Sequence, residues 1–444
     1  DAREYIPVAD RAPCVRYNLC RMVVEDAVSL LFGDGHFPGV QIDDEATRDA
    51  LSDLIAETRL AETMQDAAVR GSIGSVAIRL IVLRQRVFFD VFDTLYLTPE
   101  YDPEEPDRLI RIVERYKVKG RDLAAKGYVI PEDALATDHW FRREWDINNE
   151  RWFVPQTVAD AAAGKPPRID AGRSVTHQLG FCPWVWIKNL GAGRDKIDGP
   201  STFAAAVESQ IEIEYQLSLG GRALKYSASP TLMLKEPSGT GTVALAAGDT
   251  IIVSEKGDGK WLEIDGGASE AVREHVRLLR EFALESIHGN RSNADKVSAA
   301  QSGRALELLH QPLIWLADKL RLSYGEGGLL PLLRMVVEAA RKYPLKVNGK
   351  AVRLAVDQPM TLAWPRWFPP TAADRSSDAT TLVALTSHGL MSQETALRQI
   401  APVYDVADPG AEASAIATDQ AKADQRAAAQ AAQITAATSV ESSA

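Results

Sequence analysis

Near its start the chain repeats apolar residues every three or four positions. The segments YNLCRMVVEDAVSLLF (17–32) and DDEATRDALSDLIA (43–56) show this spacing, and residues 60–69 continue it. Such spacing places the apolar side chains on one face, which is typical of helices packed on a core. We therefore expect the chain to open with three helices.

From Ser75 the pattern changes to β-branched and aromatic residues that partly alternate with polar ones. The stretches SVAIRLIVLRQRVFFDVFDTLYLTP and HWFRREWDINNERWFVP have this character, and DINNE in the second supplies a turn. Alternation of this kind is typical of paired strands. Residues 72–190 are therefore predicted to be mostly antiparallel sheet.

Two long helical patterns then enclose a short β-rich stretch. The first starts near Ser201 and extends for about twenty residues or more, and the second is ASEAVREHVRLLREFALESIH (268–288). Between them TLMLKE, TIIVSE and KWLEID read as strands, separated by turns at SGTG and KGDGK. This order predicts a small β module inserted between two helices.

A polar loop rich in Asn and small residues follows, and then a leucine stripe. Leu306, Leu309, Leu313, Leu316 and Leu320 alternate gaps of three and four positions, as expected for a helix that packs on other helices. One proline, Pro312, interrupts the stripe. Because a proline removes one backbone hydrogen bond and clashes with the preceding turn, we predict a single helix bent at this residue.

The last part of the chain is predicted to be mainly helical. Its predicted elements are a helix over 329–342, a hairpin turning at Asn348 and Gly349, an edge strand near MTLAWPRW, and helices over 372–388 and 392–400, the last capped by Ser392. The final stretch, AKADQRAAAQAAQITAATSVESSA, is expected to be helical at most in its first half.

Charge and composition narrow the classes of partner. The chain has 444 residues, 50 basic against 61 acidic, and a formal net charge of -11, without a dense basic block. Tight nucleic-acid binding through phosphate neutralisation is therefore not expected. No apolar run reaches the ~18 residues of a membrane span, and the start lacks the apolar segment of a secretory signal. We expect a protein made in a cytoplasm, with no membrane partner and its three cysteines reduced.

Known catalytic motifs are missing from the sequence, and we expect no cofactor and no metal. Each Gly-Lys pair lacks the rest of a phosphate-binding loop, and GTGTVA from Gly239 precedes a strand-like stretch where a dinucleotide site requires a helix. The acidic stretch PEYDPEEPDR offers hard-metal ligands but is more typical of a solvated turn. One alternative is an enzyme whose active site includes Asp102, Glu104 and His139.

The tryptophans allow two interpretations. Trp140, Trp145, Trp152, Trp184 and Trp186 all fall in predicted strands. They are able to stack nucleobases, but without basic residues on the same face we expect them in the sheet core or in subunit contacts.

The order of these parts resembles the portal proteins of tailed bacteriophages. The resemblance is carried by Gly180, Pro183, Asn189, Asp198, Gly199 and Ser201 before a long helix, by Ser302–Leu306 after the loop, and by the ending LTSHGLMSQETALRQIAPVYDVADPGAEA. It extends from about Tyr17 to Thr418. Portals form a ring of about twelve subunits at one capsid vertex, through which a separate terminase ATPase drives DNA.

The resemblance implies an α+β fold with a mixed α/β wing, a helical stem, a small β clip, a kinked tunnel helix and a helical crown. Its implied boundaries are 1–198 and 325–370 for the wing, 199–227 and 268–288 for the stem, 228–267 for the clip, 289–299 for the tunnel loop, 300–324 for the kinked helix, 371–418 for the crown, and 419–444 for an Ala/Gln/Ser-rich tail. Pro312 would cause the kink.

The same resemblance implies where partners bind. The tunnel loop would line the DNA channel with Gly289, Asn290, Arg291, Ser292, Asn293 and Lys296. Arg291 and Lys296 would face phosphate briefly, while acidic walls keep the duplex on the axis. In an alternative interpretation, the loop is an exposed connector and both cations are solvated.

Docking partners are implied for the clip and the particle. Terminase large subunit and, later, a head-tail adaptor would meet the clip residues Lys235, Glu236, Lys256, Asp258 and Lys260, all expected at strand ends and turns. The other implied partners are double-stranded DNA without sequence specificity, further copies of the chain, the major capsid protein and scaffold. The location would be the portal vertex of a virion, assembled in a bacterial cytoplasm. Another oligomeric tail or baseplate protein is a second alternative.

Overall fold

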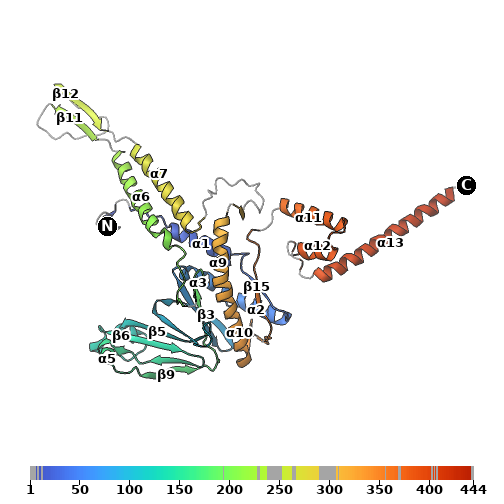
Figure 1. Cartoon of the computed structure of the whole chain (residues 1–444), viewed down its shortest axis with the longest axis horizontal. Coiled ribbons are helices and arrows are strands. Elements are labelled where there is room, and N and C mark those ends of the chain that lie inside the picture. The colour runs from blue at the N-terminus through green and yellow to red at the C-terminus, as the bar shows by residue number, and fades with distance from the viewer. Residues whose placement is uncertain are drawn as a thin grey trace. The chain divides into compact units, whose positions relative to one another are not determined.

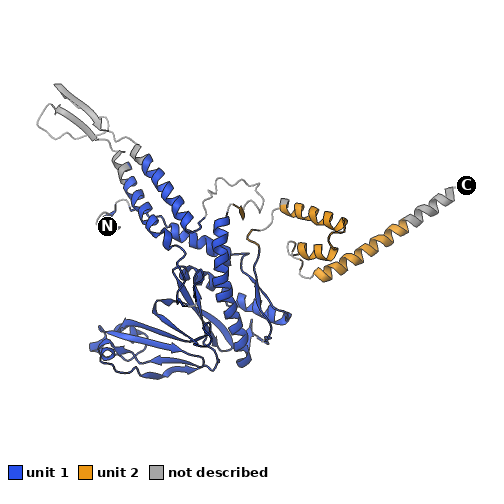
Figure 2. Cartoon of the chain, viewed as in Figure 1, with its two compact units in different colours: residues 1–292, 310–365 blue, residues 293–309, 366–444 orange. Residues whose placement is uncertain are grey.

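The chain, seen in a computed structural model, divides into two compact units. One contains residues 1–292 and 310–365, and the other contains residues 293–309 and 366–444 (Figure 2). The structure describes residues 7, 10, 11, 14–193, 195–227, 231–237, 253–262, 267–289, 307, 308, 310–355, 357–368, 372–401, 404, 406 and 409–441.

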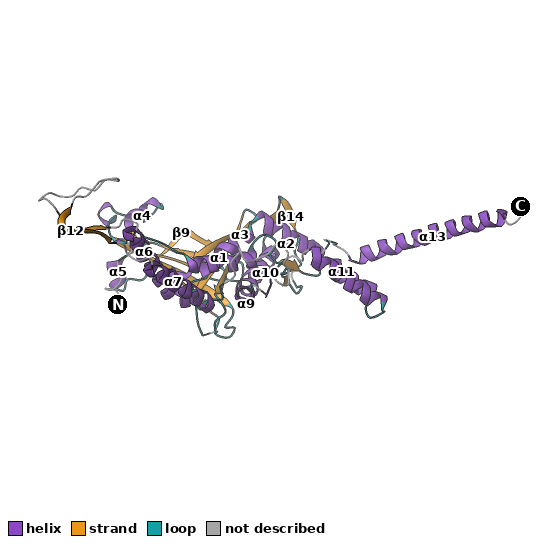
Figure 3. Cartoon of the chain, turned by 90° about the horizontal axis from the view of Figure 1, so that it is seen from above, coloured by secondary structure: helices purple, strands orange, loops and turns teal. Residues whose placement is uncertain are grey.

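Helices and sheets alternate in the first unit in the order that the sequence predicts (Figure 1). Its helical elements are α1 (Leu19–Phe32), α2 (Glu45–Glu57), α3 (Leu60–Gly71), η2 (Thr94–Tyr96), α4 (Gly120–Ala125), η3 (Glu132–Ala134), α5 (Val158–Ala162), η4 (Ala204–Ala206), α6 (Val207–Ser227), α7 (Gly267–Ser286), α9 (Gln311–Leu320), η6 (Arg321–Leu329) and α10 (Leu330–Lys342). Its strands are β1 (Gly39–Gln41), β2 (Ser75–Leu83), β3 (Arg86–Asp93), β4 (Leu97–Tyr101), β5 (Leu109–Lys119), β6 (Asp138–Trp145), β7 (Asn149–Phe153), β8 (Gln156–Thr157), β9 (Ile169–Thr176), β10 (Trp184–Lys188), β11 (Thr231–Pro237), β12 (Val253–Leu262), β13 (Leu345–Val347), β14 (Lys350–Val352) and β15 (Thr361–Ala363). This mixture of helices and antiparallel strands confirms the predicted α+β class (Figure 3).

Two antiparallel sheets occupy the predicted β region. One has the order β10-β2-β3, and the other has the order β4-β5-β6-β7-β9 with β8 paired to β6. Alternate residues of β2 lie on opposite faces of the smaller sheet. Ile78 belongs to the main helical core, while Ala77 belongs to a second core that contains Trp145 and Trp184. The rings of these two tryptophans lie 4.6 Å apart and meet edge to face. The smaller sheet is therefore covered by helices on one side and by the larger sheet on the other.

Capping and turn chemistry explain two local features, of which the hairpin turn at Asn348 and Gly349 confirms a prediction. Asp44 caps α2 by accepting a hydrogen bond from the Thr47 amide at 2.8 Å. Between β13 and β14, Asn348 and Gly349 both have positive φ, as an Asn-Gly hairpin turn requires. The sequence pattern missed β1, whose three residues pair with β15 over a sequence distance that local spacing does not reveal.

The expected bend at Pro312 is wrong within the described residues. α9 begins at Gln311, so Pro312 lies in its first turn, where the missing amide leaves no hydrogen bond broken. The irregular segment is η6, a π-helix in which the Leu330 amide reaches back to the Gly325 carbonyl. Pro331 follows directly and has no amide to donate, so a wider turn before it is physically reasonable. The helical backbone then continues to Lys342 without a break.

The second unit contains three helices. They are α11 (Ala372–Ser387), α12 (Gln393–Ile400) and α13 (Pro409–Glu441). Ser392 caps α12 as expected, accepting from the Thr395 amide at 3.2 Å. The prediction that the tail is helical only in its first half is wrong, because α13 continues to Glu441. Alanine, which dominates this stretch, is the best helix former.

Candidate assembly surface

The motif residues around Asn189 form a buried junction from which α6 starts. The Asn189 side chain is fully buried, and its amide nitrogen donates to the Pro200 carbonyl at 2.7 Å and to the Thr202 hydroxyl at 2.9 Å. Its side-chain oxygen accepts from the Tyr324 hydroxyl at 3.1 Å. A buried polar group with this many partners fixes the backbone around it. The motif is therefore structural: it sets the direction in which the chain enters α6.

Gly199 and Asp198 complete the junction. A Cβ atom on Gly199 would lie 1.8 Å from the Asn189 carbonyl oxygen, so only glycine fits. Asp198 accepts a short hydrogen bond from the Ser75 hydroxyl at the start of β2. The helix predicted to start near Ser201 instead begins with the 3-10 turn η4, since the residues before it serve the junction.

The start of α1 is anchored on α6. Three backbone amides donate to side chains of α6. The amide of Val15 donates to Ser218 at 3.1 Å, that of Tyr17 to Glu214 at 3.2 Å, and that of Cys20 to Gln210 at 2.9 Å. Asn18, the residue that precedes α1, makes no side-chain cap of its own. Gln210 of α6 thus satisfies one open amide in the first turn of α1, and the other two bonds tie the segment before α1 to α6.

The helices α6 and α7 lie side by side as an antiparallel pair (Figure 1). They approach closely at Gly220, where a Cβ atom would lie 3.1 Å from a methyl group of Val272. The pair carries large apolar side chains that face water: Ile211 and Leu224 on α6 are 44% and 56% exposed, and Leu278 and Phe282 on α7 are 44% and 54% exposed. Leu278 and Phe282 are four positions apart and form one exposed apolar ridge.

A second exposed apolar site lies on the helix that follows the polar loop. Trp315 on α9 is 54% exposed, and Leu322, seven positions later, is 67% exposed. Residues seven apart lie on the same side of a helix. Together Trp315 and Leu322 form a second candidate surface for contact with another protein.

At the C-terminal end of α7, the structure differs from the predicted channel loop. His288 adopts a left-handed conformation with φ of 57°, and the Gly289 amide donates to the Leu284 carbonyl at 2.8 Å, which closes the helix. Gly289 is buried, and a Cβ atom there would lie 2.5 Å from Leu284 and 2.9 Å from Val23. It therefore belongs to the packed end of α7 and not to an exposed loop. The other predicted channel residues, Asn290, Arg291, Ser292, Asn293 and Lys296, lie outside the described residues.

The predicted clip contains the hairpin of β11 and β12. Lys235 pairs with Asp258 and Met233 pairs with Lys260. The stretch KGDGK is predicted to be a turn, but it lies inside β12, where Asp258, Gly259 and Lys260 pair with β11. Lys256, Asp258 and Lys260 are thus strand residues, and Lys235 and Glu236 lie near the end of β11.

The residues of the alternative enzyme site do not come together. Asp102 follows β4 beside Leu109 of β5, whereas His139 pairs with Val118 near the other end of β5. Nine residues of extended strand separate the two positions by about 30 Å. His139 is 3% exposed, and its Nδ1 atom contacts the Thr137 carbonyl oxygen at 3.2 Å.

In the described part of the chain, no cluster of three or more metal-ligating side chains is found, and no helix is long and apolar enough to cross a bilayer.

The tryptophan prediction is confirmed in part. Trp145 and Trp184 are fully buried, and Trp186 is 9% exposed. Trp140 and Trp152 differ, because the guanidinium carbons of Arg115 and Arg143 lie 4.2 and 4.5 Å from the centres of their rings. The expectation that no basic residue shares their face is wrong, since strand pairing brings in cations from neighbouring strands.

Near these rings, one buried ion pair lies within the larger sheet and another joins it to the smaller sheet. Arg143 pairs with Glu114 at 2.9 Å. Arg79 of β2 pairs with Glu150 of β7 at 2.5 Å. All four side chains are only 11% to 14% exposed. Burial lowers the pKa of Arg79, although Glu150 opposes this. The guanidinium of Arg143 also contacts the ring of Trp145, at 4.2 Å. Of these contacts, the Arg79–Glu150 pair links the larger sheet to the smaller one.

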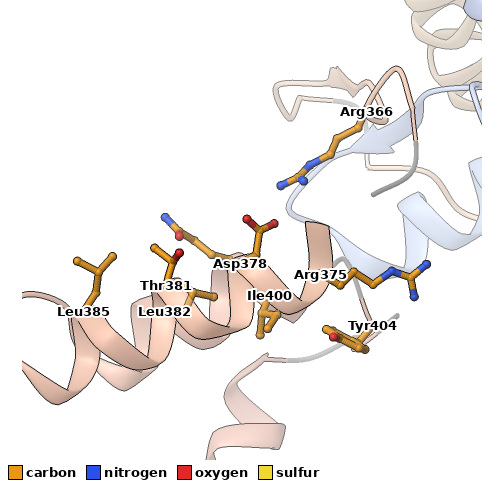
Figure 4. A pocket seen from close by; sticks show the side chains of 9 residues that line it. Arg366, Arg375, Asp378, Thr381, Leu382, Leu385, Ile400 and Tyr404 are labelled. Atoms are coloured by element: carbon orange, nitrogen blue, oxygen red, sulfur yellow. The ribbon is translucent and has the colours of Figure 1, made fainter. Parts of the chain in front are cut away.

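The second unit has little core of its own. Among its described residues, Ala401 is the only buried apolar side chain, whereas Val383, Leu390 and Tyr404 are 66%, 77% and 52% exposed. A pocket of about 490 Å³ lies between α11 and α12, lined by side chains that include Arg366, Arg375, Asp378 and Tyr404 (Figure 4). The described residues of this unit therefore bury little apolar surface within one copy.

Comparisons with known proteins find weak likeness among solved structures. No protein-family model matches the sequence, and no curated protein matches it. Among solved structures, a chain in the virion of a native gene transfer agent particle is similar with a TM-score of 0.36 and 12% identity, over 85% of this chain and 87% of that chain. A likeness at this level assigns neither the fold nor the function.

Proposed function

We propose that this chain is the portal subunit of a particle of the tailed-bacteriophage type. About twelve copies would close into a ring at one vertex of the capsid, and double-stranded DNA would pass through its centre. The ring would dock a terminase ATPase during packaging and a head-tail adaptor later, and the capsid protein and scaffold would surround it. The proposal starts from the sequence resemblance and is supported by the arrangement of α6 and α7.

The observation that carries the proposal is the exposed ridge on an anchored helix pair. α6 is fixed at its base by the Asn189 junction, and the pair exposes Leu278 and Phe282 to solvent. A rigid helix pair with an apolar ridge is suited to pack on the same pair in a neighbouring copy. The weak core of the second unit supports the same view, because contacts between copies would cover its exposed apolar residues.

Electrostatics also fits a conduit for DNA. The chain carries a net charge of -11, so a ring of copies would present a mainly acidic surface to the duplex. The negative charge of the ring would repel DNA and so prevent tight binding. A protein that makes ~6–10 phosphate contacts loses ~10³–10⁵ in affinity for DNA over a modest rise in salt, which shows how strongly such contacts bind. A channel has to avoid that strength of binding along its length.

Imaging of the purified chain by negative-stain electron microscopy, together with native mass spectrometry, tests the proposal. The expected result is a ring of one dominant copy number with a central hole wide enough for duplex DNA. A species that stays a single subunit at high concentration, or a closed particle without a hole, contradicts it.

The role of the polar loop is a separate part of the proposal. Arg291 and Lys296 would contact phosphate in the channel, so Arg291→Ala with Lys296→Ala is expected to lower the yield of packaged DNA while rings still form. Unchanged packaging by this variant would support the alternative of a solvated connector.

A further inference from the structure

The outer face of the larger sheet carries a basic pocket. It measures about 130 Å³, and its lining includes Arg115, Arg142 and Lys165 together with Trp140. Lys117, next but one to Arg115 on β5, points to the same face, and its ammonium group lies 5.1 Å from the centre of the Trp140 ring. Four cations therefore gather on one small surface of a chain that is acidic as a whole.

Two of these cations lack an anionic partner within the described structure. Arg142 donates to Glu144 at 2.6 Å, and Lys165 pairs with Asp160 at 2.6 Å. Arg115 and Lys117 are exposed and contact only the ring of Trp140. The pocket thus keeps a net positive charge. The ring of Trp140 holds Arg115 and Lys117 in place for an incoming anion.

An acidic turn lies at the other end of the same strand. Residues 102–108, between β4 and β5, contain four carboxylates and one arginine. The Asp102 side chain accepts from the amides of Glu104 and Glu105 at 2.9 and 3.4 Å, which holds the turn in one shape. Glu104 and Asp107 are exposed and have no ion-pair partner in the described part of the chain.

Within one copy, the turn and the pocket are too far apart to meet. The turn ends at Leu109, and Arg115 and Lys117 lie six to eight residues further along β5, or about 20–27 Å. The two surfaces are therefore able to meet only between molecules. Since the two surfaces differ, a contact between them is head to tail, which is the kind of interface that closes a ring.

We propose that the acidic turn 102–108 of one copy docks on the basic pocket of the next copy, with Glu104 and Asp107 facing Arg115 and Lys117. This contact rests on the proposed ring and names a second interface in it, distinct from the α6 and α7 ridge. The small size of the pocket fits carboxylate side chains better than the wide backbone of a duplex. Glu144, which shares this face, is already paired with Arg111 and Arg142.

A charge-reversal cycle tests the contact. One variant carries Arg115→Glu with Lys117→Glu, the second carries Glu104→Lys with Asp107→Lys, and the third combines all four. Lys346→Glu with Lys350→Glu, at two exposed positions of the β13–β14 hairpin, is the matched control. Assembly is measured by analytical ultracentrifugation near physiological salt, and folding by circular dichroism.

Each reversal alone places like charges opposite one another and is expected to lower the assembled fraction about tenfold or more, whereas the combined variant restores it. The control pair should assemble like wild type. Reversals that leave assembly unchanged, a combined variant that stays dissociated, or a loss of DNA affinity with intact rings would each overturn the contact. A wild-type chain that forms no oligomer would overturn the proposed ring as well, so the two failures are distinguishable.

Discussion

The hydroxyl of Tyr324 donates a hydrogen bond of 3.1 Å to the side chain of Asn189, 135 positions earlier in the chain. Both side chains are fully buried, and Tyr324 lies in the π-helix η6 while Asn189 follows β10. Burial raises the pKa of Tyr324, so the phenol stays protonated and keeps donating. This one bond connects the end of the sheet region, the start of α6 and the helix that leads to α10.

Removing the hydroxyl should therefore weaken the whole first unit. Tyr324→Phe leaves the buried oxygen of Asn189 without a donor, and the free energy of unfolding is expected to fall by about 1–3 kcal/mol. Urea denaturation measures it. Tyr96→Phe, at a side chain that is 52% exposed, is the control and should change stability by less than about 0.5 kcal/mol. Equal effects of the two substitutions would show that the bond does not stabilise the fold.

Gly199 makes a sharper prediction, because its neighbour is backbone. Gly199→Ala would place a methyl group 1.8 Å from the Asn189 carbonyl oxygen, and neither atom is able to move without opening the junction. We expect a loss of about 4 kcal/mol or more, seen as insoluble protein or a much lower melting temperature. Gly39→Ala, where nothing lies within 4 Å, should behave like wild type. A soluble Gly199→Ala protein of normal stability would contradict the geometry.

Much of the fold was predictable from local pattern. The helices α1 to α3, the antiparallel sheets, the Asn-Gly hairpin and the Ser392 cap all follow from residue spacing and turn chemistry, which act within a few positions. One error shows what periodicity does not reveal. Pro312 was placed inside a helix because the leucine stripe continues through it, but periodicity does not show where a helix begins.

The candidate site was less predictable, because strand pairing and burial create it. Arg115 and Trp140 are twenty-five positions apart in sequence, and only the register of β5 on β6 brings them together. The motif residues were correctly singled out, yet their role as a buried junction appears only when Tyr324 is placed against Asn189. The exposed ridge on α7 was likewise hidden, since the sequence does not show which apolar face of a helix stays uncovered.

Arg143 shows how neighbouring strands of the larger sheet depend on one another. It pairs with Glu114 at 2.9 Å and lies between the rings of Trp145 and Trp152. Arg143→Met leaves Glu114 as a buried charge without its partner, which is expected to cost about 3–5 kcal/mol. Arg143→Met combined with Glu114→Gln removes that charge and should recover part of the loss. Unfolding free energies of the two single variants and the double variant form the test, and strictly additive values would refute the coupling.

Acid should destabilise the first unit through His177. Burial lowers its pKa below the ordinary value of 6.5, although Asp146 and Glu150 oppose the shift. Its Nδ1 atom accepts a hydrogen bond from the Leu179 amide at 3.3 Å, which the protonated ring is unable to do. The unfolded chain therefore takes up a proton at higher pH than the folded chain. The contribution of the neutral His177 ring to the free energy of unfolding is complete above about pH 6.5 and is lost as pH falls below it.

Urea midpoints measured between pH 8 and pH 5.5 check this sign. Wild type should lose stability on acidification, and His177→Gln should lose less. Some loss will remain, because burial also lowers the pKa of His36 and His310. Identical slopes for wild type and His177→Gln would show that this ring does not titrate with folding.

The apolar ridge on α7 gives the most direct test of assembly. Leu278 and Phe282 are 44% and 54% exposed, so replacing both with Glu removes no core packing and should leave the melting temperature of the subunit nearly unchanged. In a ring the same change would bury charges between neighbouring helix pairs, and the assembled fraction should fall about a hundredfold or more. Val129→Glu, at a fully exposed residue of the same unit, is the control. Because only assembly covers the ridge, a Leu278→Glu, Phe282→Glu protein that forms normal rings would place the subunit interface elsewhere.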